Sequence, residues 1–426
     1  MFGNFTRSAI SIALMLMLVT PAFTHSTTSE NTAVHGLDPQ RLGRIDTVIN
    51  EEIAAGKIPG AVALIAHNGK LVYHKSFGFS DLDSQTPMQT NSIFRIASMT
   101  KAITSVAVMV LYEQGRFRLS DPVSRYIPAF TDMTLLSGPD ENGKTSRIEA
   151  KKPIRIIDLL THSSGLSYPF IPSNVQQDYL DAGVIDGLTA KDVTLKSQME
   201  LLAKQPLMFE PGSRWAYGLS TDLLGYLVEV VSGQPLDQFF EENIFVPLAM
   251  HDSYFFLPDE KADRLVTLYA DVEPGGLIVS KGNESSLILD NPRYPVEGAR
   301  RFFSGGAGLS STAYDYARFC QMLLNAGTLD GKRILSRKSV ELMRAPRADI
   351  DKDGRADFSL GFFVNTDLGQ SNELGSMDTF SWGGAFNTAY WIDPAENLVA
   401  IIMTQVRPAS SDINERFQIL VYQALE

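Results

Sequence analysis

The residues best suited to chemistry begin with a serine and a lysine three positions apart, Ser98 and Lys101. They open a stretch, 98–114, with the composition of a helix, in which an amine one turn after a hydroxyl can reach it. A serine hydroxyl needs an adjacent base to become a nucleophile, and a lysine is that base only when neutral. A helix start also offers backbone N–H groups to an oxyanion. The pair suggests acyl transfer, but a capping serine followed by a solvated lysine has the same pattern.

Two further segments carry groups that could work with this pair. Tyr217 ends the run Pro-Gly-Ser-Arg-Trp-Ala-Tyr, just before a predicted helix at 219–232. A phenol beside an ammonium loses its proton more easily and can relay protons to and from a serine, although such a tyrosine can also be a plain aromatic anchor. Farther along, Gly383 and Gly384 stand before a predicted strand. Paired glycines there permit close approach of a backbone or ligand, or mark a β-bulge.

Five segments, taken together, resemble the serine β-lactamase and penicillin-binding superfamily, most of all the class C-like branch with the family VIII carboxylesterases. The resemblance covers about residues 36–425 and implies that Ser98 is acylated while Lys101 and Tyr217 act as coupled base and acid. It also implies an oxyanion hole formed by the backbone N–H groups of Ser98 and Ala385, and no cofactor. His162, within the second segment, is interpreted as a packing and capping residue. The segments are 93–101, 158–166, 211–217, 305–311 and 380–384.

Departures from the family pattern suggest the substrate. Trp382, Gly383 and Gly384 stand where β-lactamases carry Lys-Thr-Gly, and Leu219 stands where they carry the asparagine of Tyr-x-Asn. We place these four residues at the substrate. Loss of a charged and an amide contact should cost a carboxylated amide several kcal/mol, at about 1.5–3 kcal/mol for a charged hydrogen bond. An ester needs neither contact.

The sequence therefore predicts a serine hydrolase that cleaves short-chain carboxylic esters, with a small-molecule ester or amide as its partner. Within enzymes, the alternatives are a β-lactamase or D-alanyl-D-alanine carboxypeptidase, and an acyltransferase that uses another acceptor. From another class, the alternative is a non-catalytic ligand-binding or sensor protein of the same fold.

The strands and helices expected along the chain predict an α/β protein with an antiparallel sheet flanked by helices. A hairpin is expected at 60–74 around the Asn68-Gly69 turn, and a second at 388–404 around Asp393-Pro394. We expect a sheet domain from 30–130 plus 296–426 and a mostly helical domain with lid-like loops at 131–295. Within the latter, the polar stretch 173–196 is interpreted as a lid or surface loop.

Composition and the first residues bear on location. The formal charge of −12 and the isoelectric point near 5.1 argue against a nucleic-acid partner. Arg7 before the apolar run 9–19 predicts a secretory signal peptide over 1–25, with a retained anchor as the alternative. The run is too short to span a bilayer, so we expect an exported protein, periplasmic or secreted, without stable membrane insertion. The single cysteine, Cys320, is expected to be a small buried hydrophobe.

Two other motifs are weaker. Residues 138–145 formally match a phosphate-binding loop, but two acidic residues and a proline within them favour a hairpin loop. Residues 349–357 match the start of a calcium loop, with Leu360 where a glutamate ligand belongs; calcium binding is an alternative to a polar turn. No Gly-x-Ser-x-Gly elbow and no metal-binding pair of histidines occurs in the sequence, so no metal site is predicted.

Overall fold

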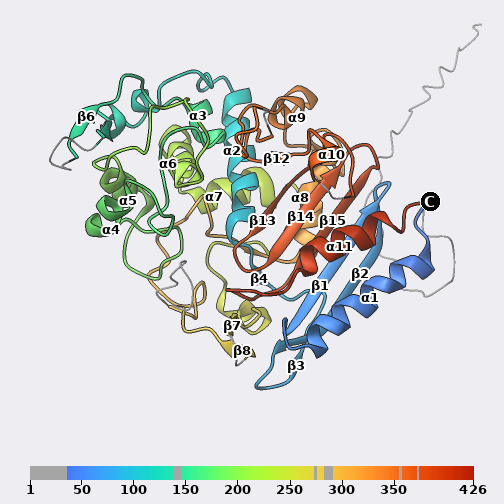
Figure 1. Cartoon of the computed structure of the whole chain (residues 1–426). Coiled ribbons are helices and arrows are strands. Elements are labelled where there is room, and N and C mark those ends of the chain that lie inside the picture. Colours follow the sequence, from blue (N-terminus) through green and yellow to red (C-terminus); the bar gives the residue numbers. More distant parts are fainter. Residues whose placement is uncertain (1–35, 139–144, 273–275, 283–290, 355–356, 372–373) are drawn as a thin grey trace, which may run out of the picture.

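A seven-stranded sheet of order β12-β13-β14-β15-β1-β2-β3 forms the centre of the molecule, and all its neighbouring strands are antiparallel. Its strands come from both ends of the chain (Figure 1), as the sequence predicts. The strands are β1 Gly60–His67, β2 Lys70–Asp81, β3 Thr86–Pro87, β12 Phe363–Val364, β13 Phe380–Gly384, β14 Thr388–Asp393 and β15 Leu398–Met403. The computed structural model describes residues 36–138, 145–272, 276–282, 291–354, 357–371 and 374–426; the predicted signal peptide at 1–25 lies outside them.

Both predicted hairpins are confirmed. Asn68 and Gly69 join β1 to β2 with φ values of 52° and 72°, the left-handed backbone that an Asn-Gly hairpin turn requires. At the other end of the chain, Asp393 closes the β14–β15 turn, because its side chain accepts hydrogen bonds from two backbone N–H groups of the turn. Turn chemistry in the sequence therefore fixes the register of both hairpins.

Helices cover both faces of the sheet. Along β1, Val62 and Leu64 point into one apolar core, while Ala63 and Ile65 point into a second core under α1 and α11. Helix α8 packs on the first face, against β1, β14 and β15. No helix among the described residues is long and apolar enough to cross a membrane. The helices are α1 Pro39–Ala54, α2 Thr100–Glu113, α3 Ile156–Leu160, α4 Gln176–Ala182, α5 Leu195–Leu202, α6 Ser220–Ser232, α7 Leu236–Phe240, α8 Ala313–Leu324, α9 Arg337–Arg344, α10 Leu368–Ser371 and α11 Ile413–Tyr422.

Helix α2 stands between the sheet and the helices α3–α7 (Figure 1). Ten of its residues, 100–109, are all buried, so it serves as the centre of the larger core. Helices α2 and α6 correspond to the helices predicted at 98–114 and 219–232. Helices α3–α7 fall within the predicted helical domain at 131–295, whose division from the sheet domain stays a prediction.

One predicted loop is partly wrong. Residues 173–196 contain the two-turn helix α4 and the start of α5. Val175 and Tyr179 are fully buried in the main core, and this burial stabilises a helix that the polar composition hides. Residues 139–144 lie outside the described residues, but the strands on either side pair antiparallel, as a hairpin loop predicts. The short strands outside the main sheet are β4 Phe94–Arg95, β5 Thr134–Leu136, β6 Arg147–Glu149, β7 Tyr269–Val272, β8 Gly276–Val279, β9 Ser310–Ser311, β10 Thr328–Leu329 and β11 Lys332–Arg333.

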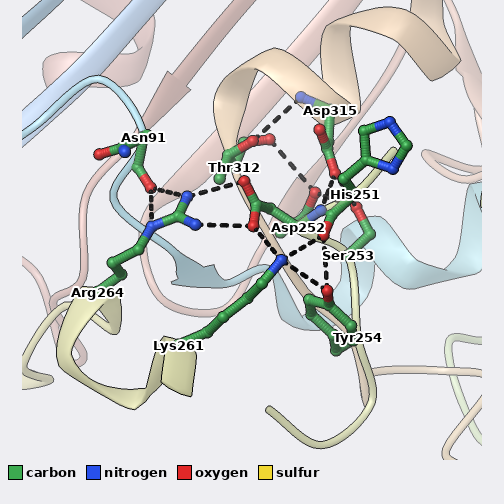
Figure 2. A network of polar contacts seen from close by, with 10 residues as sticks. Asn91, His251, Asp252, Ser253, Tyr254, Lys261, Arg264, Thr312 and Asp315 are labelled. Carbon is green, nitrogen blue, oxygen red and sulfur yellow. Dashed lines mark hydrogen bonds and ion pairs between the residues drawn. The ribbon is translucent and has the colours of Figure 1, made fainter. Parts of the chain in front are cut away.

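A polar network fixes the segment 251–264 against the start of α8 (Figure 2). Arg264 forms a two-pronged ion pair with Asp252, at 2.8 Å for each contact, and Lys261 pairs with the same carboxylate. The buried Asp315 accepts hydrogen bonds from the Asp252 N–H at 2.7 Å and the Ser253 hydroxyl at 3.0 Å. Since this segment bridges to Ser310, the network holds the start of α8 and the strand β9 that precedes it.

Candidate active site

Ser98 lies in a short 3-10 turn, Ala97–Met99, that leads directly into α2. The preceding residue, Ala97, has a left-handed φ of 41° and is buried, so the packing around it holds an unfavourable backbone conformation. Ser98 itself is half-buried, and its side chain faces a cavity. The sharp turn therefore presents the hydroxyl at the end of a buried helix.

Lys101 lies one turn later and is almost fully buried, with 2% of its surface exposed. Its ammonium donates hydrogen bonds to the Ser98 Oγ at 3.3 Å, the Tyr168 hydroxyl at 2.9 Å and the Gly306 carbonyl at 2.8 Å. The three donors of the ammonium group thus meet three neutral oxygens. This geometry does not fit the alternative of a solvated lysine behind a helix cap.

Tyr217 reaches the same serine from the loop before α6. Its hydroxyl donates a hydrogen bond to the Ser98 Oγ at 2.7 Å, and the Lys101 Nζ lies 4.6 Å from its ring centroid. The ring packs against Tyr168 and Trp382 at centroid distances of 5.4 and 5.6 Å. The structure therefore brings the three predicted residues together, and aromatic neighbours hold the phenol in place.

The end of β13 lies tightly against the serine turn. A Cβ atom on Gly384 would lie 2.4 Å from the Ile96 carbonyl oxygen and 2.2 Å from the Thr388 Oγ1, so only glycine permits this approach. The β13–β14 pairing runs in register without a bulge, which decides between the two interpretations of the glycine pair. Ala385, the next residue, lines the same cavity as Ser98, where its N–H and that of Ser98 could stabilise an oxyanion.

The cavity at Ser98 has a volume of about 370 Å³ and is mostly apolar. Trp382 and Gly383 form part of its wall, and their contact with a substrate stays a prediction. It also contains an acidic and a basic side chain, Asp186 and Arg407, and the Asp186 charge acts to raise the pKa of Arg407, which burial lowers more strongly. The lining residues are Ala97, Ser98, Tyr168, Phe170, Asp186, Tyr217, Ala307, Trp382, Gly383, Ala385 and Arg407.

Comparison with known proteins decides the family. The family model described as Beta-lactamase matches residues 45–423. The chain belongs to the β-lactamase family of serine hydrolases. A protein of Mycobacterium tuberculosis is 35% identical, over 84% of this chain and 89% of its own length. Esterase EstB of Burkholderia gladioli is 28% identical, over 85% of this chain and 89% of its own length.

The same relationship holds in three dimensions. The solved structure of EstCE1, described as a hydrolase with promiscuous acyltransferase activity, superposes with a TM-score of 0.76. The two sequences are 29% identical, and the match covers 91% of this chain and 98% of EstCE1. The predicted β-lactamase-like fold, with its antiparallel sheet and helical region, is therefore confirmed.

Two residues of this β-lactamase-family chain lie elsewhere than the sequence suggests. Leu219 immediately precedes α6, is fully buried in the main core and does not line the Ser98 cavity, so the structure does not place it where the predicted substrate contact would be. The short turn before α6 points the Tyr217 ring at Ser98 and turns Leu219 away. Gly384 also does not line this cavity; it packs against the serine turn.

His162 is a packing residue, as interpreted from the sequence. It is 1% exposed, with its ring 5.0 Å from that of Tyr217 and 5.5 Å from that of Phe358. Burial, together with the nearby charge of Lys101, lowers its pKa well below the ordinary value. Its backbone carbonyl accepts the Ala216 N–H at 2.8 Å and so fixes the loop that carries Tyr217.

Sequence reasoning missed two buried polar residues beside Lys101. Tyr168 is 2% exposed and accepts a hydrogen bond from the Lys101 ammonium; burial raises its pKa well above the ordinary value, with Tyr217 and nearby carboxylates adding to the shift. Asp222 is fully buried and lies behind Gly306. Tyr168 lies two residues after the second family segment, and Asp222 is an acidic residue in the apolar pattern of α6, so both positions carried a weak signal.

The other candidate groups lie away from the site. Cys320 is fully buried in α8, as expected, and burial raises its pKa well above the ordinary value, which disfavours the reactive thiolate. In the possible calcium loop, Asp349 accepts hydrogen bonds from the N–H groups of Lys352 and Gly354, and Asp357 accepts one from that of Ile350. These bonds are those of a polar turn. Among the described residues, no group of three His, Cys, Asp or Glu side chains is arranged to hold a metal ion.

Proposed function

We propose that this chain is an exported carboxylesterase that hydrolyses esters of short acyl chains through an acyl-Ser98 intermediate. The observation that carries the proposal is the contact of the Ser98 Oγ with both the Tyr217 hydroxyl, at 2.7 Å, and the Lys101 ammonium, at 3.3 Å, beside a mostly apolar cavity. The relationship to EstB, named an esterase, and to EstCE1, named a hydrolase, supports it.

In the proposed reaction, the Ser98 Oγ attacks the ester carbonyl carbon while its proton passes to the coupled Tyr217 and Lys101 pair. The carbonyl oxygen becomes an oxyanion, which the N–H groups of Ser98 and Ala385 stabilise. When the tetrahedral intermediate collapses, the C–O bond to the alcohol breaks and the pair returns the proton to the leaving alcohol. A water molecule then attacks the acyl-serine by the same steps, and the acid leaves.

The cavity favours a small uncharged ester. Its volume of about 370 Å³ is near the lower end of the roughly 300–1,000 Å³ typical of small-molecule sites. Trp382 supplies a flat apolar wall where a charged side chain would attract a carboxylate. The cavity does contain Arg407, whose positive charge the nearby Asp186 partly offsets. A β-lactam carboxylate would therefore gain less there than beside an unopposed cation.

An acyltransferase is the second candidate, because EstCE1 is described as having promiscuous acyltransferase activity. It needs the same acyl-Ser98 intermediate and differs only in the acceptor that replaces water. Addition of a short alcohol to the ester assay, with the transfer product measured against the free acid, separates the two. Transfer that exceeds hydrolysis at low alcohol concentration would favour the transferase.

The test of the main proposal is a panel of p-nitrophenyl esters from acetyl to decanoyl, run beside nitrocefin. We expect the highest kcat/KM on the shortest chains, slow nitrocefin turnover, and no turnover by Ser98→Ala. Labelling by a fluorophosphonate, followed by mass spectrometry, should place the adduct on Ser98. Ser213→Ala, at an exposed position, is the matched control and should label normally.

Two outcomes would overturn the proposal. Nitrocefin turnover much faster than p-nitrophenyl butyrate turnover would make the chain a β-lactamase. An unlabelled Ser98 with no turnover of any ester would indicate a binding or sensor protein. Export is proposed from residues 1–25 alone, and cell fractionation with N-terminal sequencing of the mature chain tests it; an intact N-terminus in the cytoplasm would refute it.

A further inference from the structure

A buried carboxylate lies directly behind the proposed catalytic lysine. Asp222, in the first turn of α6, is fully buried. Its Oδ1 accepts hydrogen bonds from the Ser304 hydroxyl at 2.5 Å and the Gly306 N–H at 3.3 Å. Its Oδ2 has no hydrogen-bond partner among the described residues. A buried carboxylate oxygen without a partner is costly, so its presence needs a reason.

Lys101 has the complementary feature. Among the described residues, the hydrogen-bond acceptors of its buried ammonium are neutral oxygens, those of Ser98, Tyr168 and Gly306. No ion pair joins it to a carboxylate in the described part of the chain. A buried cation of this kind requires a counter-charge nearby.

One peptide unit links the two charged groups. The Gly306 carbonyl accepts from Lys101, and the Gly306 N–H donates to Asp222. A Cβ atom on Gly306 would lie 2.4 Å from the Asp222 Oδ2 and 3.0 Å from the Tyr168 hydroxyl oxygen. Only glycine allows the carboxylate and the lysine environment to approach so closely.

We propose that Asp222 is a positioning residue that supplies the counter-charge for Lys101 and so sets the pH at which the Ser98, Lys101 and Tyr217 group becomes active. The proposal rests on the proposed esterase function. Asp222 touches neither the nucleophile nor the cavity, so it acts through Lys101 and Gly306 and not on the substrate.

The other titratable groups around Lys101 do not supply this charge. His162 is held neutral, because burial and Lys101 lower its pKa. Tyr168 is held as a neutral phenol, because burial raises its pKa. Asp186 lines the cavity, where it acts on Arg407 and Tyr168. Burial raises the pKa of Asp222 above the ordinary value of a carboxyl group, and the Ser304 hydrogen bond and the Lys101 charge oppose part of that rise.

The direction of the effect does not depend on which group is the base. A negative charge at Asp222 stabilises the Lys101 ammonium and disfavours a Tyr217 phenolate, so it makes the first proton harder to remove from the pair in either case. Loss of the charge should therefore move the acid limb of the kcat/KM profile to lower pH. For charges one peptide unit apart, the shift should be on the order of one pH unit.

The experiment measures kcat/KM for p-nitrophenyl butyrate against pH for wild type and Asp222→Asn, with product quantified by chromatography. The variant should remain active and show the acid limb about one pH unit lower. Asp393→Asn is the matched control: Asp393 is also fully buried and accepts two backbone N–H bonds, but it lies at the end of β14 remote from Gly384. Asp393→Asn should lower the thermal stability of the protein without a shift of the acid limb of its kcat/KM profile.

If the acid limb of the kcat/KM profile of Asp222→Asn coincides with that of wild type, the proposal is overturned and Asp222 is a structural residue. If Asp222→Asn fails to fold, Ser304→Ala tests the proposal, because it removes a hydrogen bond that favours the ionised carboxylate. The acid limb of its kcat/KM profile should move to lower pH, by less than in Asp222→Asn. An acid limb at the wild-type pH would refute the proposal. If the wild-type protein does not hydrolyse the ester at all, the proposed esterase function itself is refuted, independently of any comparison of pH profiles.

Discussion

Gly384→Ala offers the sharpest test of how the sheet and the nucleophile are held together. The added methyl group would meet the Ile96 carbonyl oxygen at 2.4 Å and the Thr388 Oγ1 at 2.2 Å. Each distance is about 1 Å shorter than an ordinary van der Waals contact of roughly 3.5 Å. Because the Ile96 oxygen belongs to the backbone of the serine turn, the methyl group cannot be accommodated by a side-chain rotation alone. The end of β13 must move away from the serine turn.

The expected cost follows from that displacement. Ala385, whose N–H we assign to the oxyanion hole, would move by about 1 Å relative to Ser98, and a shift of that size can lower the rate about 100-fold. A 100-fold loss corresponds to about 2.7 kcal/mol of transition-state stabilisation. The overpacking should also lower the free energy of unfolding by about 1–3 kcal/mol.

The assay is steady-state hydrolysis of p-nitrophenyl butyrate, with the acylation rate measured separately by fluorophosphonate labelling. Both should fall in Gly384→Ala, with kcat affected more than KM. Gly383→Ala is the control at the neighbouring position, since its added Cβ would meet the Thr388 carbonyl oxygen at 3.2 Å and needs only a small adjustment. Its loss of kcat and of labelling rate should be far smaller than that of Gly384→Ala. A Gly384→Ala enzyme within threefold of wild type would refute this account of the oxyanion site.

Three further predictions follow from the site and from the network of Figure 2. Tyr217→Phe should lower kcat about 10²–10⁴-fold with KM nearly unchanged, since it removes the group 2.7 Å from the Ser98 Oγ; a loss below tenfold in ester kinetics would exclude the phenol from proton transfer. Trp382→Lys should raise the ratio of nitrocefin to butyrate turnover by about tenfold, because a charged hydrogen bond to a carboxylate contributes about 1.5–3 kcal/mol; an unchanged ratio would count against the substrate assignment. Burial raises the pKa of Asp315 to about 6, above its unfolded value, so its stabilising contribution is present at low pH and is lost as pH rises through about 6. Urea unfolding should therefore show that the free energy of unfolding of wild type decreases from pH 4 to pH 7 by about 2 kcal/mol more than that of Asp315→Asn. Equal decreases in the two proteins would contradict the assignment.

Local chemistry made much of the fold predictable. The Asn68-Gly69 turn specified the first hairpin, because few other residues adopt its left-handed backbone. The family segments placed Ser98, Lys101 and Tyr217 at one site. Their contacts depend on chain segments brought together only by the fold, and the structure supplies the distances.

The errors and omissions also have physical causes. Leu219 follows Tyr217 by two residues, and the turn before α6 sends the two side chains in different directions, which residue types alone do not reveal. Asp222 carries only a weak signal in the sequence, since its partners Ser304 and Gly306 come from a distant segment. Helix α4 was hidden because one buried residue, Tyr179, anchors an otherwise polar stretch.

The pairing of β1 with β15 has a consequence for synthesis of the protein. All eight residues of β1 are buried, and its register with β15 joins Val62 to Met403. A growing chain therefore carries an apolar strand with one open edge until residue 403 has left the ribosome. Pairing between such distant segments forms slowly, and an open apolar edge is a template for aggregation. Translation that stops short of β15 would yield a fragment in need of a chaperone, whatever the state of its helices.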